Sequence, residues 1–68
     1  MKDRWEQQFD RRAELLEQLS GLNIALARHG AVADITLAEA AGVREIATLE
    51  HLVDATARRL ALIMDSQS

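Results

Sequence analysis

The stretch "LARHGAVADITLAEAAG", residues 26–42, decides the fold, because the spacing of apolar residues changes within it. On either side of it, apolar residues recur every three and four positions in turn, which is the pattern of an amphipathic helix. The stripe before it comprises Trp5, Phe9, Arg12, Leu16, Leu19, Asn23 and Leu26, and the stripe after it comprises Ile46, Leu49, Val53, Thr56, Leu60 and Ile63. The two stripes are out of phase, so the helix must break between them.

Local signals predict where two helices end and begin. Arginine and histidine just before Gly30 favour a helix C-terminus, and Gly30 suits the left-handed residue that follows one. Thr36 followed by Glu39 is a capping box, in which each side chain binds a backbone N–H of the other residue. We therefore predict helices at about residues 3–29 and 37–65.

A short connection favours antiparallel packing, so the predicted fold is an all-α antiparallel helical hairpin, a single domain over residues 1–68. In that hairpin Asn23 lies opposite Gly42, where we expect a kink or a close approach. The composition agrees with an all-α class, since the chain has no proline, three glycines and 49% hydrophobic residues. It also lacks cysteine, which excludes disulfides and thiolate metal sites and suits a cytoplasmic setting.

Residues 37–43, "LAEAAGV", are similar to the first half of a bacterial helix-turn-helix. The second half of that motif needs hydrophobic residues at fixed distances from the glycine, and those positions hold Thr48 and His51. Leu49 and Leu52 come one residue late, a rotation of about 100° on a helix. We also expect no third helix to complete the usual core, so the pattern favours a chain reversal over a DNA-reading motif.

The chain carries more apolar residues than two helices can bury against each other. Five large ones flank the stripes: Leu15, Leu22, Val43, Leu52 and Met64. Keeping each out of water is worth roughly 1.5–3 kcal/mol, so together they represent about 10 kcal/mol, comparable with the stability of a small domain. We expect a second copy to cover this edge in a homodimeric four-helix bundle, or a different protein partner to cover it.

Four other residues are candidates for partner contact or specificity. Trp5 and Phe9 lie one turn apart at the free end of the hairpin, where an aromatic pair can be a binding hot spot or simply core. Arg12 and Asn23 occupy core-type positions. Arg12 can reach an acidic residue such as Asp54 or cross an interface. Asn23 can set register and oligomeric state or cap irregular backbone near Gly42.

The charge of the chain argues against nucleic acid as the first choice of partner. The net charge is −3, whereas nucleic-acid-binding domains are usually basic. A basic arc of Arg4, Arg11 and His29 on the first helix nevertheless forms a possible phosphate-binding surface, doubled in a symmetric dimer.

Nothing in the sequence points to catalysis, a cofactor, a metal or a small-molecule substrate. His29 and His51 lie too far apart along the chain for a helical zinc pair, and no phosphate-binding glycine loop or nucleophile elbow is present. Residues 1–10 do not read as a signal peptide, and the longest apolar run, residues 60–64, is too short to span a bilayer.

These features predict a small, non-enzymatic protein–protein interaction module of the inhibitor, anti-activator or small chaperone type. We expect it to act in the cytoplasm as a homodimer, through an apolar helix face. The alternative is a nucleic-acid-binding modulator that uses the basic arc or a degenerate helix-turn-helix.

Overall fold

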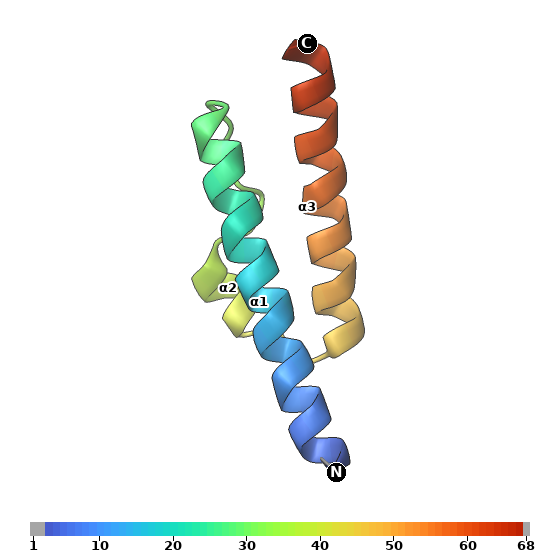
Figure 1. The fold of residues 1–68 in the computed structure, drawn as a ribbon. Coiled ribbons are helices and arrows are strands. Elements are labelled where there is room, and N and C mark those ends of the chain that lie inside the picture. Colours follow the sequence, from blue (N-terminus) through green and yellow to red (C-terminus); the bar gives the residue numbers. More distant parts are fainter. Residues whose placement is uncertain (1–2, 68) are drawn as a thin grey trace.

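The computed structural model describes residues 3–67, and these form three helices (Figure 1). Helix α1 spans Arg4–Arg28, helix α2 spans Leu37–Ala41, and helix α3 spans Ile46–Gln67. The long helices α1 and α3 pack against each other, and α2 packs on α1. The prediction of an all-α fold built on two long packed helices is confirmed, in a molecule that measures 45 × 22 × 16 Å.

The ends of α1 follow the local signals in the sequence. At its start, the Asp3 carboxylate accepts a hydrogen bond of 2.9 Å from the backbone N–H of Glu6, which satisfies one of the donors that a helix leaves unpaired. At its end, Gly30 has a φ of +76°, and the N–H of Ala31 donates to the carbonyl of Leu26 at 2.9 Å. The left-handed glycine predicted at position 30 is confirmed.

Helix α2 begins at the predicted capping box. The Thr36 hydroxyl accepts from the N–H of Glu39 at 3.1 Å, and the Glu39 carboxylate accepts from the N–H of Thr36 at 3.2 Å. The helix then ends after one turn, at Ala41, and the chain is helical again only from Ile46. The prediction of one continuous helix over residues 37–65 is therefore wrong between Gly42 and α3. The expectation that the chain has no third helix is wrong as well, because the break makes α2 a helix of its own.

A side chain from α1 explains this break. The Arg12 guanidinium donates hydrogen bonds to the carbonyls of Ala41 and Val43. In a continuous helix these two carbonyls would accept from the N–H groups of Glu45 and Ala47, four residues further on. Arg12 replaces both helical bonds, and the half-buried Val43 packs against the core instead of continuing the helix.

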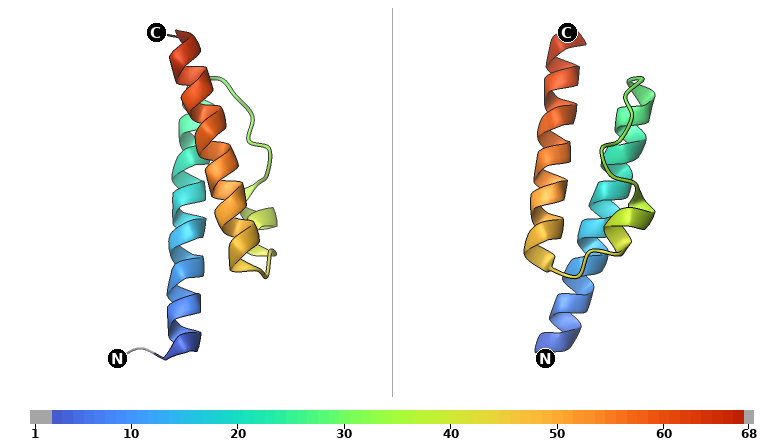
Figure 2. Two further views of the ribbon diagram at one scale, coloured as in Figure 1. Left: turned by 90° about the vertical axis from the view of Figure 1, so that its right-hand side faces the viewer. Right: turned by 180° about the vertical axis from the view of Figure 1, so that it is seen from behind.

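Helices α1 and α3 run in the same direction, so the predicted antiparallel arrangement is wrong (Figures 1 and 2). Arg11 pairs with Glu50, 39 positions later, and His29 pairs with Gln67, 38 positions later. The sequence separation between the paired residues is nearly constant, which is typical of parallel helices. In an antiparallel pair, a residue further along α1 would have a partner nearer the start of α3. The chain reverses twice, and residues 30–45, the return segment, carry it back along α1 before α3 begins.

The core lies where α1, α2 and α3 meet. Its fully buried side chains are Leu15, Leu19, Leu26, Ala40 and Leu49. Half-buried residues pack around the central cluster, namely Leu16, Ile35, Val43, Ile46, Leu52 and Val53. The return segment thus contributes part of the core and covers a face of α1 that a two-helix hairpin would leave open.

Side chains of the long helices also hold the irregular part of the return segment. The Asn23 amide donates to the carbonyl of Ile35 at 3.0 Å. The Arg59 guanidinium donates to the carbonyl of Val32 and lies 3.4 Å from the carboxylate of Asp34. Together with Arg12 these contacts fix the path of a segment that has few backbone bonds of its own.

Candidate interaction surface

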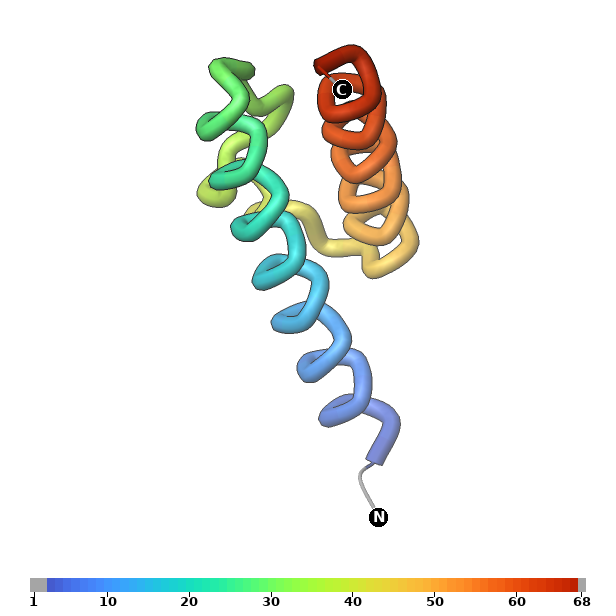
Figure 3. Tube along the Cα trace, turned by 45° about the horizontal axis from the view of Figure 1, so that its top comes forward, coloured from blue at the N-terminus to red at the C-terminus, as the bar shows by residue number. Residues whose placement is uncertain are grey.

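The first turns of α1 extend beyond the start of α3 (Figure 3). They carry two exposed aromatic side chains. Trp5 is 75% exposed and Phe9 is 62% exposed. Their ring centroids lie 6.0 Å apart with an interplanar angle of 13°, so the rings stack on one another. We call these two residues the aromatic end. It continues the apolar stripe of α1 past the point at which α3 stops covering that stripe.

The aromatic end has a basic edge and an acidic edge. On one side it borders an open notch of about 190 Å³, which is also lined by Arg12, Arg44 and Ile46. On the other side a second hollow is lined by the aromatic rings together with Glu6 and Asp10. An apolar strip between charged edges is the usual anatomy of a small protein–protein contact surface.

The apolar edge predicted from the sequence is largely covered by the chain itself. Leu15 is 1% exposed and lies in the core of the single chain, so it is not part of an exposed surface there. Leu22, Val43 and Leu52 are half-buried, and the last two pack against the core. Met64 remains 52% exposed, near the C-terminal end of α3. These residues do not form one continuous exposed surface, because the return segment and α3 pack over most of them.

Four exposed large apolar residues of the described part of the chain were not singled out from the sequence. Ile24 on α1, Val32 in the return segment, Leu37 on α2 and Leu62 on α3 are 54%, 82%, 41% and 70% exposed. Leu62 lines a shallow hollow with Arg58 and Asp65. Nothing in the heptad pattern distinguished these positions, because they lie outside both stripes.

Arg12 and Asn23, predicted to set register or specificity, both act within the chain. Arg12 binds the end of α2, and Asn23 binds the irregular backbone at Ile35 rather than lying opposite Gly42. The Asn23 Oδ1 atom is buried without a hydrogen-bond partner. Both residues therefore position the return segment, one on each side of α2.

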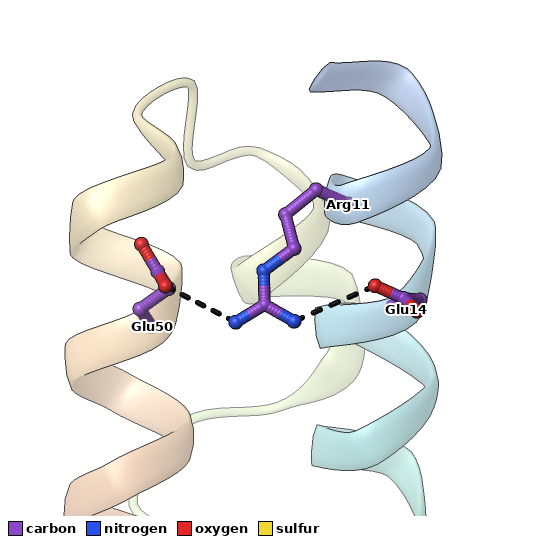
Figure 4. Close-up of polar contacts among 3 residues, drawn as sticks. All are labelled: Arg11, Glu14 and Glu50. Carbon is purple, nitrogen blue, oxygen red and sulfur yellow. Dashed lines mark hydrogen bonds and ion pairs between the residues drawn. The ribbon is translucent and has the colours of Figure 1, made fainter. Parts of the chain in front are cut away.

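The predicted basic arc is not a continuous cationic surface. The Arg11 guanidinium lies 3.1 Å from the Glu50 carboxylate and 3.4 Å from that of Glu14 (Figure 4). The hydrogen bond with Glu50 raises the pKa of Arg11 above its ordinary value. His29 lies at the opposite end of α1 from Arg4, and its Nδ1 is 2.7 Å from the Gln67 Oε1.

The chain exposes more surface than a compact protein of its mass. Its accessible surface is 5137 Å², whereas a folded monomer of this mass exposes about 4,300 Å². The elongated body and the thin return segment produce this excess.

The described residues contain neither a metal site nor a membrane-spanning helix. Within residues 3–67, no three His, Asp or Glu side chains lie together as a metal site would require. No helix of this part of the chain has both the length and the apolar content needed to cross a bilayer. Comparisons with protein-family models, curated proteins and solved structures returned no match to this chain.

Proposed function

We propose that this chain is a non-catalytic protein–protein interaction module that binds its partner through the aromatic end. The observation that carries the proposal is the exposure of Trp5 and Phe9, a stacked pair at 75% and 62%. Large aromatic residues supply much of the energy of protein interfaces, and Trp is enriched among their hot spots. Two such side chains left in water on the tip of a small helical protein are a surface that a partner would cover.

We further propose that the chain acts as a homodimer in the cytoplasm, as an inhibitor, an anti-activator or a small chaperone. The exposure of Trp5, Phe9 and Met64 supports the need for a partner, because together they leave large apolar side chains in water. The absence of cysteine supports a reducing compartment.

The arrangement of charges favours a protein partner over nucleic acid. Three of the arginines that could bind phosphate already lie against carboxylates: Arg11 with Glu14 and Glu50, Arg58 with Asp54, and Arg59 with Asp34. Phosphate binding would need these pairs to open. Binding that weakens steeply with salt would indicate nucleic acid, whereas an apolar interface is hardly affected by salt.

Affinity capture with matched variants tests the proposal. The bait is the full chain, its double variant Trp5→Ser/Phe9→Ser, and the control Leu62→Ser, which removes an equally exposed apolar side chain elsewhere. A protein captured by the wild type and by L62S, but not by the double variant, and rebound after purification, supports the aromatic end as the binding surface. Equal capture by all three baits would refute it.

A further inference from the structure

We propose that two copies of this chain exchange α3, so that α2 and α3 of each copy join into one helix that packs on α1 of the other. This inference rests on the homodimer proposed above and names its architecture. In the exchanged dimer residues 37–67 form a single helix of about 46 Å. Exchange of an identical element is a common route to a dimer, because it re-forms between chains the contacts that each chain makes alone.

The junction between α2 and α3 is short, and its first residue is already in a helical conformation. Gly42 lies in the right-handed helical region, with φ of −81° and ψ of −10°. The N–H groups of Gly42 and Val43 donate to carbonyls three residues back, at 3.1 and 3.0 Å, and the N–H of Leu49 donates to the carbonyl of Glu45 at 3.2 Å. The hydrogen bonds that end α2 reach Val43, and the first hydrogen bond of α3 starts from Glu45, so the peptide units of residues 43–45 are the ones that must turn in the exchange.

If the junction straightens, α3 of one copy can run parallel to α1 of a second copy that is related to the first by a two-fold axis. The return segment runs from the C-terminal end of α1 towards its N-terminal end (Figure 2). If residues 37–67 continued straight, α3 would pass beyond the start of α1 and meet an inverted second copy. There it would run parallel to that copy's α1, so the pairs Arg11–Glu50 and His29–Gln67 would form between chains as they now form within one.

The exchanged dimer also brings the two aromatic ends together. Trp5 and Phe9 line the same notch as Arg44 and Ile46, which are the two ends of the junction. At the two-fold axis the aromatic ends of both copies and both straightened junctions would come together. The rings of the two copies would then lie side by side across the two-fold axis and form one larger apolar surface for the partner proposed above.

Arg12 opposes the exchange. Its guanidinium occupies the carbonyls of Ala41 and Val43 in the single chain, and a continuous helix would return those carbonyls to the N–H groups of Glu45 and Ala47. Arg12 therefore acts as the contact that holds the closed form, and the two forms differ by few hydrogen bonds.

Cross-linking distinguishes the outcomes, because the natural chain has no cysteine. The variant His29→Cys/Gln67→Cys places two thiols at exposed positions that lie side by side, to be joined by a short bis-maleimide. Light scattering gives the mass in solution, and denaturing electrophoresis shows whether the cross-link lies within or between chains. A dimer in solution with cross-links between chains supports the exchange.

The other outcomes overturn it in distinguishable ways. A dimer with cross-links only within chains overturns the exchange and leaves the proposed homodimer standing. A monomer at all concentrations overturns both.

A proline variant gives an independent check. Arg44→Pro lies outside both helices of the single chain but inside the joined helix, and should weaken dimerisation at least ~100-fold. The control Ala33→Pro lies in the irregular part of the return segment and should leave dimerisation unchanged. Equal dimerisation by both variants would overturn the exchange.

Discussion

The contact between Arg12 and the end of α2 can be tested by removing its charge and keeping its stem. In Arg12→Met the methylene groups that pack along α1 are largely retained, but the hydrogen bonds to the carbonyls of Ala41 and Val43 are lost. A hydrogen bond to a charged group contributes about 1.5–3 kcal/mol. The contact with Ala41 is exposed, and water can replace it, so only the part-buried contact with Val43 counts fully. The expected loss of folding stability is about 2 kcal/mol.

For a domain of this size, each kcal/mol shifts the melting temperature by about 4–8 °C, so R12M should melt about 8–16 °C below the wild type. The assay is thermal unfolding followed by circular dichroism, at a concentration at which both proteins are monomeric. The control is Arg58→Met, which breaks a surface pair with Asp54 on a side chain that is 78% exposed, and should melt within about 3 °C of the wild type. Equal melting of R12M, R58M and the wild type would refute the role given to Arg12.

Three further changes test the packing and the helix ends, each by thermal or urea unfolding. Leu19→Ala empties a fully buried site and should destabilise the chain by about 2–5 kcal/mol; a smaller loss would mean that the core is not packed as described. Gly30→Ala forces a side chain into φ of +76° and should destabilise by about 1 kcal/mol, whereas Gly21→Ala, inside α1 with open space around it, should stabilise by a similar amount; effects of the same sign would contradict the assignment. Thr36→Ala should cost about 1 kcal/mol, and a neutral result would show that the capping box does not hold α2.

The helix ends could be predicted from the sequence because they depend on residues a few positions apart. The left-handed Gly30 and the capping box of Thr36 and Glu39 are local signals, and both lie where they were expected. The long amphipathic stripes also identified α1 and most of α3, since the repeat itself sets which residues face the core.

An irregularity at Gly42 was predicted from the sequence, but a full break between α2 and α3 could not be. It depends on Arg12, which lies about thirty positions earlier and reaches the carbonyls of Ala41 and Val43 only after α2 has folded back on α1. Apart from that contact, residues 42–45 have neither a proline nor a residue with positive φ that would end a helix. The missed break hid the second chain reversal, and with it the parallel direction of α3.

The candidate surface was predicted only in part, because the return segment was not foreseen. Trp5 and Phe9 were named as partner contacts, and the structure leaves both exposed at the free end of α1. Leu15 was assigned to the same surface because a two-helix hairpin would expose it. The return segment, which no pairwise pattern predicts, instead helps to bury it.

The parallel direction of α1 and α3 is the claim on which the fold, the aromatic end and the exchange all depend, and energy transfer from Trp5 tests it most directly. Trp5 is the only tryptophan, and a cysteine can be added at either end of α3 to carry an acceptor dye. With the dye at Ala47→Cys, near the start of α3, we predict strong transfer. With the dye at Ser66→Cys, at the far end of a molecule 45 Å long, we predict weak transfer. Strong transfer to position 66 and weak transfer to position 47 would show an antiparallel hairpin and contradict the account.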